Sequence, residues 1–184
     1  IDGEPLDRRH LLGTCFLLLL AGIDTTWSAI GSSLWHLATH PEDQARLRAE
    51  PDLIDSAVEE LLRVYSPVTM AREVIADVDV AGCPMKPGDK VLMSFPAANR
   101  DPAQFENPDE FIIDRERNRH VAFGSGIHRC LGSNLARMEL RVAIQEWLTR
   151  IPTFELADPA AVTWTGGQVR GPRTIPVRWS ATQP

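Results

Sequence analysis

The feature that most constrains the fold is a long helical pattern close to the start of the chain. Apolar residues recur at three- and four-residue steps from residue 7 to about residue 39, which predicts one helix over that range. At about 1.5 Å per residue, such a helix is roughly 50 Å long, which is more than the diameter of a small domain. Residues 17–21 are apolar on every side, so we expect the middle of the helix to be buried.

Prolines, glycines and changes of hydrophobic period divide the rest of the chain into shorter elements. Pro41 ends the long helix and suits the first turn of the next one, and Pro67 ends a third helix. We therefore expect a mainly α-helical chain with small β-sheets. The predicted elements are a helix from 41, a helix from 52 to before 67, short strands over 68–95, an ordered loop over 99–119, a glycine-rich loop over 120–132, a helix over 131–151, short strands over 154–179 and a linker over 180–184.

The helix predicted over 131–151 carries two apolar stripes. A helix with apolar residues on two sides is buried over most of its surface, so we expect this helix to lie inside the protein. The stripes are formed by Leu131, Leu135, Met138 and Val142, and by Ala136, Leu140, Ala143 and Trp147.

Composition narrows the class of protein. The chain of 184 residues suits one domain, and its net charge of −6 argues against a nucleic-acid partner. The longest apolar stretch, residues 15–23, is shorter than the ~20 residues of a membrane-spanning helix, so no membrane segment is expected. Three widely spaced cysteines match no disulfide framework or zinc pattern, which favours a reducing, cytoplasmic setting. Because the chain opens with Ile1 and soon enters helical sequence, we expect it to be a piece of a longer protein.

The strongest chemical signal is the string FGSGIHRCLG at residues 123–132. It delivers one cysteine, Cys130, to the start of a helix, where the helix dipole and free N–H groups favour the thiolate. The glycines at 124, 126 and 132 allow a large flat ligand to approach the backbone closely. The alternative is that Cys130, like most lone cysteines, is simply a small buried apolar residue.

Taken whole, this string resembles the haem-binding signature of the cytochrome P-450 family. The resemblance implies that Cys130 is the axial ligand of the iron of haem b. It also implies that Phe123, Gly124 and Gly132 lie against the haem and that His128 contacts a propionate.

A second string, AGIDTT at residues 21–26, resembles the oxygen-activating motif of the same family. The small residues Ala21 and Gly22 would let the macrocycle lie against the helix, and Asp24 and Thr25 would be catalytic residues that relay protons. The alternative for Thr25 is a hydroxyl that bonds to a carbonyl one turn earlier and bends the helix. Both can hold together.

Glu60 and Arg63 resemble the family's E-x-x-R pair, and Arg115 matches the third member of that cluster. An i,i+3 ion pair alone says little, because exposed helices carry many of them. The neighbouring leucines indicate burial, so we expect these three residues to form a structural cluster. Ile112 departs from the family pattern, which has Asp at that position.

The remaining family positions concern the haem propionates and the substrate. Arg72 matches a propionate-binding residue, although a solvated strand residue is the alternative. Val68, Thr69, Gln168 and Val169 match substrate-facing positions, although they can also be ordinary core or turn residues. The other cysteines, Cys15 and Cys83, match no motif.

The resemblance covers only the C-terminal half of the family's catalytic domain. It implies a haem-thiolate monooxygenase that inserts one oxygen atom into a small apolar or aromatic organic substrate. The electrons would come from NAD(P)H through a ferredoxin or flavin reductase, separate or fused. The missing N-terminal part would complete the site, so this fragment alone would be inactive and would expose apolar surface on its long helix. The alternatives are a peroxide-dependent oxidase and a catalytically inactive haem-binding fragment.

Overall fold

The computed structural model describes residue 3 and residues 5–180. Residues 181–184, most of the predicted linker, lie outside the described residues. The helices are α1 (Arg8–Thr39), α2 (Pro41–Ala49), α3 (Ile54–Val64), α4 (Phe95–Ala98) and α5 (Ser133–Arg150), with 3-10 turns η1 (Pro51–Leu53), η2 (Gly126–His128) and η3 (Pro159–Ala161). The strands are β1 (Met70–Glu73), β2 (Val78–Val80), β3 (Cys83–Met85), β4 (Lys90–Met93), β5 (Phe154–Leu156), β6 (Thr163–Thr165), β7 (Gly171–Thr174) and β8 (Val177–Trp179). The prediction of a mainly α-helical chain with small sheets is confirmed.

Local sequence signals set the limits of α1. The Asp7 carboxylate accepts the backbone N–H of His10 at 2.9 Å, which satisfies one of the free donors at the helix start. Pro41 follows the end of α1 and occupies the first turn of α2, where its missing N–H costs nothing. The two helices are thus consecutive, and only His40 lies between them.

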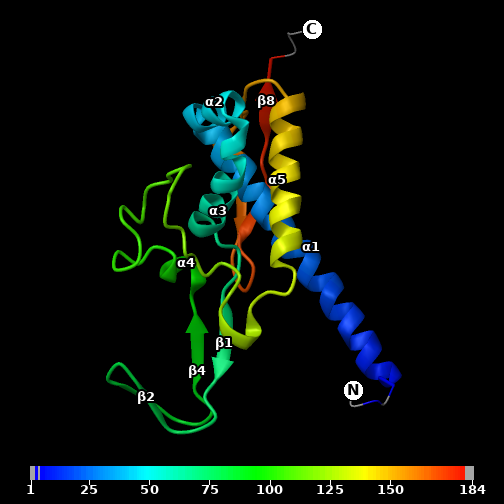
Figure 1. Cartoon of the computed structure of the whole chain (residues 1–184), viewed down its shortest axis with the longest axis vertical. Coiled ribbons are helices and arrows are strands. Elements are labelled where there is room, and N and C mark those ends of the chain that lie inside the picture. The colour runs from blue at the N-terminus through cyan, green and yellow to red at the C-terminus, as the bar shows by residue number, and fades with distance from the viewer. Residues whose placement is uncertain (1–2, 4, 181–184) are drawn as a thin grey trace.

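The strands form four separate two-stranded antiparallel sheets, paired β1–β4, β2–β3, β5–β8 and β6–β7. An isolated bridge joins Val68 to Val169, so two segments about a hundred residues apart lie side by side. Helices α1, α3 and α5 lie next to one another, β5 and β7 pack against α1, and the β1–β4 and β2–β3 sheets extend away from the helices at one end (Figure 1).

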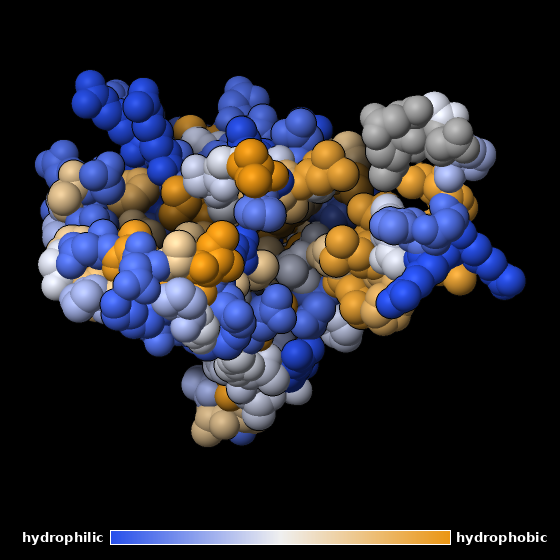
Figure 2. Space-filling view, turned by 90° about the horizontal axis from the view of Figure 1, so that it is seen from below, coloured by the Kyte–Doolittle hydropathy of each residue, from blue (hydrophilic) through white to orange (hydrophobic). Residues whose placement is uncertain are grey.

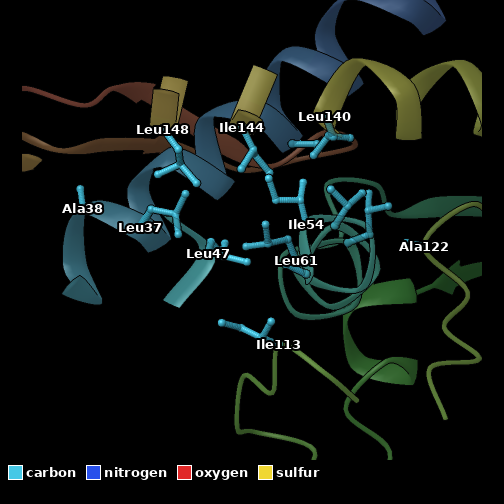
Figure 3. Packing of buried hydrophobic residues seen from close by; sticks show 14 of the residues in the cluster. Leu37, Ala38, Leu47, Ile54, Leu61, Ile113, Ala122, Leu140, Ile144 and Leu148 are labelled. Atoms are coloured by element: carbon cyan, nitrogen blue, oxygen red, sulfur yellow. The ribbon is translucent and has the colours of Figure 1, made fainter. Parts of the chain in front are cut away.

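The core lies where the C-terminal half of α1 meets α2, α3 and α5 (Figure 3). Leu37, Leu61 and Ile144 come from three different helices and are at most 2% exposed. Burying a side chain of this size contributes roughly 1.5–3 kcal/mol, so contacts of this kind hold the helices together.

The expectation that residues 17–21 are buried is wrong for this chain. Leu17, Leu18, Leu19 and Leu20 are 55–65% exposed. The reason is that the elements packed against α1 in the described part of the chain meet its C-terminal half, while its N-terminal half extends beyond them (Figure 1). Hydrophobic surface lies beside hydrophilic surface around this protruding end (Figure 2). Apolar surface on the long helix is therefore exposed in the described part of the chain.

By length and composition alone, α1 would be able to cross a membrane. This differs from the sequence expectation, which counted only the uninterrupted apolar run. With its many leucines, the helix is long and apolar enough even though it also contains glycine, threonine and one acidic residue. The core helix of a soluble protein can be equally long and apolar, and residues such as His36 and Leu37 of α1 are fully buried in the protein core.

Helix α5 is buried on one of its two predicted stripes. Of the stripe that contains Leu140, Leu140 itself is 1% exposed and its other members are half-buried, whereas Leu131 is 89% and Leu135 55% exposed. The prediction of burial on both sides is therefore wrong for this chain, because no element in its described part covers the stripe formed by Leu131, Leu135, Met138 and Val142.

Candidate functional site

The glycine-rich loop, residues 120–132, holds Cys130 just before the first turn of α5. The backbone N–H of Cys130 donates to the Phe123 carbonyl at 2.8 Å, which closes the loop on itself. The thiol is free and exposed. Helix α5 begins three residues later, so the sulfur lies close to the positive end of an 18-residue helix. The alternative considered from the sequence, a buried apolar cysteine, does not apply, because the Cys130 thiol is exposed.

Two glycines in the loop adopt backbone angles that other residues avoid. Gly124 has φ +71° and Gly126 has φ +67°. A Cβ at Gly126 would meet no atom within 4 Å, and a Cβ at Gly132 would lie 3.9 Å from the Cys130 sulfur. The backbone beside the thiol is therefore open, and these residues fit a large flat ligand such as haem.

Behind the loop lies an ion-pair cluster that the sequence reasoning missed. The guanidinium of Arg137 lies 4.6 Å from the centre of the Phe123 ring, and it donates to the Glu59 carboxylate at 2.6 and 2.9 Å. His120 shares the same carboxylate at 3.0 Å. Burial raises the pKa of Glu59, but the hydrogen bonds from His120 and Arg137 outweigh it and lower the pKa to about 2. No local motif marks these residues, because they come from α3, the loop and α5.

A second set of hydrogen bonds ties the loop to α3. The side-chain oxygen of Asn99 accepts the Val121 N–H at 2.7 Å, and its amide nitrogen donates to the Ser66 hydroxyl at 2.6 Å. Asn99 and Ser66 are both fully buried. The Gly124 N–H donates to the Val121 carbonyl at 2.8 Å, so the start of the loop is fixed from α3 through one asparagine.

On α1, the two predicted catalytic residues have different partners. The Thr25 hydroxyl donates to the Ala21 carbonyl at 2.6 Å, which is the alternative considered for this residue from the sequence. The Asp24 carboxylate pairs with Arg173 of β7 at 3.2 Å. Arg173 was not predicted, since it lies 149 residues away along the chain. Ala21 and Gly22 are exposed, and a Cβ at Gly22 would meet no atom within 4 Å, so this stretch of helix is also open to a flat ligand.

The four predicted substrate residues come together in pairs. The Thr69 N–H donates to the Gln168 carbonyl at 2.9 Å, beside the bridge between Val68 and Val169. By contrast, Arg72 of β1 is half-buried, and in the described part of the chain its one side-chain hydrogen bond goes to the Ala71 carbonyl at 2.9 Å. His128 is exposed in η2. The structure thus does not join Arg72 to His128.

Glu60, Arg63 and Arg115 meet in one buried cluster. Arg63 donates to both Glu60 oxygens at 2.8 and 2.7 Å, and Arg115 donates to them at 3.0 and 3.1 Å. Glu60 and Arg63 are fully buried. Burial raises the pKa of Glu60, but hydrogen bonds from Arg63, the Ile112 N–H and Arg115 hold it below its usual range. At Ile112, where the family pattern has Asp, the backbone N–H donates to Glu60 at 3.0 Å, which the side chain does not affect.

The guanidinium groups of this cluster also organise the long loop. Arg63 donates to the carbonyls of Asn99 and Glu110 at 2.9 and 2.7 Å, and Arg115 donates to that of Glu106 at 2.6 Å. These bonds hold residues 99–119 against α3 without regular secondary structure.

The long helix, the helix after the cysteine loop and the small antiparallel sheets have the arrangement of the C-terminal half of a haem-thiolate fold. The chain belongs to the cytochrome P-450 family, whose model matches residues 1–159. It is similar to cytochrome P-450 105C1 of Streptomyces sp, with 47% identity over 97% of this chain and 48% of the relative. It is also similar to the biotin biosynthesis cytochrome P-450 of Bacillus subtilis, with 46% identity over 85% of this chain and 40% of the relative.

Among solved structures, that of cytochrome P-450 CYP101C1 is similar at a TM-score of 0.93 with 43% identity. The match covers 98% of this chain and 47% of that one. The chain thus spans about half the length of the relatives it matches, and these are bacterial members of the family.

Proposed function

We propose that the whole protein to which this chain belongs is a haem-thiolate monooxygenase, and that this chain supplies its iron ligand. The observation that carries the proposal is the exposed thiol of Cys130 just before α5, beside an open glycine backbone, with the Cys130 backbone N–H fixed by the Phe123 carbonyl. When bound, haem supplies the redox chemistry by which such proteins activate dioxygen, and a thiolate ligand favours O–O bond cleavage.

This chain offers residues for both faces of the haem. Cys130, with Phe123, Gly124 and Gly132 beside it, would hold the haem from the loop side. Ala21 and Gly22 would lie against it from α1. His128 and Arg72 would neutralise the propionates, which requires the Arg72 guanidinium to leave the Ala71 carbonyl.

Asp24 and Thr25 would control protons at the oxygen site. Because the Thr25 hydroxyl donates to the Ala21 carbonyl, its oxygen keeps its lone pairs free to accept a hydrogen bond from a protonated group. The Asp24 carboxylate would carry protons from bulk water, and its pairing with Arg173 fixes where that carboxylate rests. Both partners of this pair are nearly half exposed, so the Asp24 side chain can rotate away from Arg173 at little cost.

The substrate class proposed is a small apolar or aromatic organic molecule. It would contact the paired segments that contain Val68, Thr69, Gln168 and Val169. A related Bacillus megaterium protein, CYP109E1, has been solved in complex with testosterone, at 36% identity to this chain. We propose that electrons reach the whole protein from NAD(P)H through a ferredoxin or flavin reductase, that it works in the cytoplasm, and that this half alone is inactive.

The test is the carbonyl spectrum of the ferrous full-length protein. We expect the strongly red-shifted Soret band of thiolate ligation, and we expect Cys130→Ser to abolish it. Cys83→Ser is the matched control, because Cys83 is also an exposed free cysteine but lies in β3. A red-shifted band that survives in Cys130→Ser would overturn the assignment.

A further inference from the structure

A partly buried chain of polar and aromatic side chains lies outside the site described above, with the fully buried His36 at its centre and the half-buried Tyr65 and Asp43 on either side. Tyr65, at the end of α3, contacts the His36 ring nitrogen Nδ1 through its hydroxyl at 2.8 Å. On the other side of the ring, Nε2 of His36 lies 2.8 Å from the Asp43 carboxylate. Because an ionised carboxylate only accepts, Nε2 carries the proton and the Tyr65 hydroxyl donates to Nδ1. The three side chains thus form one directed path for a proton.

The same tyrosine begins a row of aromatic rings, packed edge to face, that reaches the surface. The Trp35 ring packs edge-on against Tyr65 with 5.9 Å between ring centres, and it packs against Trp164 at 5.3 Å. Trp164 is 41% exposed. Tyr65 is the only tyrosine of the chain, and the three rings form a continuous aromatic path from the half-buried Tyr65 to solvent.

On its inner side, this path connects to the glycine-rich loop. Tyr65 is the chain neighbour of Ser66, whose hydroxyl accepts from Asn99 at 2.6 Å. Asn99 accepts from Val121 at 2.7 Å, two residues before Phe123, whose carbonyl holds the backbone of Cys130. Covalent and hydrogen bonds therefore lead without a break from the cysteine to the tyrosine.

We propose that Tyr65, Trp35 and Trp164 form an electron-transfer relay that carries an oxidising equivalent from the glycine-rich loop to the surface, with His36 and Asp43 taking up the phenolic proton. The relay itself requires no haem, but its connection to the loop rests on the proposed function. Its role would be to discharge a one-electron oxidant that meets no substrate at the haem site.

Each step balances in atoms and electrons. Tyr65 gives one electron to the oxidant and its hydroxyl proton to Nδ1 of His36, while the proton on Nε2 passes to Asp43. Trp35 then reduces the tyrosyl radical as the protons return along the same path, and Trp164 reduces Trp35. The indole proton that Trp164 loses to water is restored when a soluble electron donor of the ascorbate class reduces it.

The surroundings of the three polar groups favour transfer of both protons together. Burial lowers the pKa of His36 to about 3, with a smaller contribution from the charge of His40, so an imidazolium is costly there. Burial raises the pKa of Asp43, which makes its carboxylate a better proton acceptor. Moving both protons leaves the His36 ring neutral throughout, and Asp43 is exposed enough to exchange with water.

The first experiment oxidises the full-length protein from outside, with a photogenerated ruthenium(III) polypyridyl complex, and records the radical by freeze-quench electron paramagnetic resonance. The signal of interest is the tyrosyl radical that is present in the parent protein and lost in Tyr65→Phe. We expect Trp164→Phe and Trp35→Phe each to reduce it several-fold, and Asp43→Asn or deuterated solvent to slow its formation. Trp179→Phe is the matched control, because Trp179 is 46% exposed but lies outside this row of rings.

A Tyr65-dependent signal that survives unchanged in both Trp35→Phe and Trp164→Phe would overturn the relay, and so would the absence of any Tyr65-dependent signal. Circular dichroism and melting curves establish that each variant is folded. Trp164→Phe, at a half-exposed position, keeps the test valid if Tyr65→Phe does not fold.

The second experiment tests the connection to the haem site. Hydrogen peroxide is added to the substrate-free holoenzyme, and the loss of haem absorbance is followed with time. We expect Tyr65→Phe to bleach several-fold faster than the parent, with Trp179→Phe unchanged. If Tyr65→Phe and the parent bleach at the same rate, the connection between the haem site and the relay is wrong, although the relay itself can still exist. A failure of the proposed function would instead appear in the carbonyl spectrum.

Discussion

One hydrogen bond limits what the Thr25 hydroxyl can do in proton transfer. Its proton is committed to the Ala21 carbonyl at 2.6 Å, one turn earlier in α1. The sequence left two interpretations open, a helix-bonded hydroxyl and a proton relay. The geometry is that of the first, and it limits the second to a role in which the oxygen accepts a hydrogen bond. Asp24 is different, because its carboxylate is held across the fold by Arg173.

We predict that Thr25→Ala in the full-length enzyme leaves haem content, carbonyl spectrum and substrate affinity nearly unchanged, because one small group is lost. Less hydroxylated product and more hydrogen peroxide should form per reductant consumed. Thr25→Ser, which keeps the hydroxyl, should restore most of the coupling. The measurement is the ratio of product formed to reductant consumed, and unchanged coupling in Thr25→Ala would assign this hydroxyl to the helix alone.

Asp24→Asn should act on a different quantity, the rate of oxygen consumption. The amide cannot take up and release a proton as the carboxylate does, so protons should reach the oxygen site more slowly. An oxygen-electrode assay with saturating reductase measures this rate. If Asp24→Asn consumes oxygen as fast as the parent, Asp24 is not the link to bulk protons.

The close contact between α1 and β7 depends on two glycines, Gly171 and Gly31. A Cβ at Gly171 would lie 2.5 Å from the Cβ of Ser28 and 2.9 Å from its Cα, so the two backbones approach as closely as side chains allow. One turn along α1, a Cβ at Gly31 would lie 3.1 Å from the Pro172 ring. This close approach positions the neighbouring Arg173 beside Asp24.

We predict that Gly171→Ala destabilises the protein by about 1–3 kcal/mol, because backbone atoms of α1 must move to admit the methyl group. Gly166→Ala is the control, since a Cβ there meets no atom within 4 Å and its φ is unstrained. Urea unfolding of the full-length protein measures both changes. Equal stability of the two variants would contradict the close approach.

The sequence predicted the elements well where the pattern was long or marked by proline. Helix α1 was expected over 7–39 and is observed over Arg8–Thr39, because its period persists over about nine turns and Pro41 ends it. The four-residue helix α4 was missed, since one turn is too short to show a period. The pairs Asp24–Arg173 and Glu59–Arg137 could not be predicted from single positions, because tertiary folding alone brings these residues together.

The sequence pattern gave a wrong prediction of which apolar residues are buried. Periodicity marks residues that are apolar on all sides, as at 17–21, but it does not say which part of a protein covers them. Here the same chain buries Leu37 completely and leaves Leu17 65% exposed, because the described elements reach only the C-terminal half of α1. The chain covers about half of its relatives' length, and among the described residues no element covers this part of α1 or the open stripe of α5.

Glu59 connects three parts of the molecule, since its carboxylate on α3 accepts from His120 at the start of the glycine-rich loop and from Arg137 on α5. Nδ1 of His120 accepts the Ala122 N–H at 3.2 Å, so Nε2 carries the proton that is donated to Glu59. A folded-state pKa of about 2, below the usual 4.5, means that this carboxylate stabilises the fold above about pH 4.5 and that the contribution is lost as the pH falls toward 2.

We therefore predict that the free energy of unfolding of the full-length protein falls by at most about 3 kcal/mol over that range because of this group. Glu59→Gln should be less stable than the parent at neutral pH and should lose less stability on acidification, so the two curves converge at low pH. Glu146→Gln is the control, because Glu146 forms only an exposed i,i+4 pair with Arg150, and such pairs contribute little. Urea titrations at a series of pH values make the comparison. Parallel curves for Glu59→Gln and the parent would show that the carboxylate does not link the loop to the helices, and the position of Arg137 over Phe123 would then have to rest on packing alone.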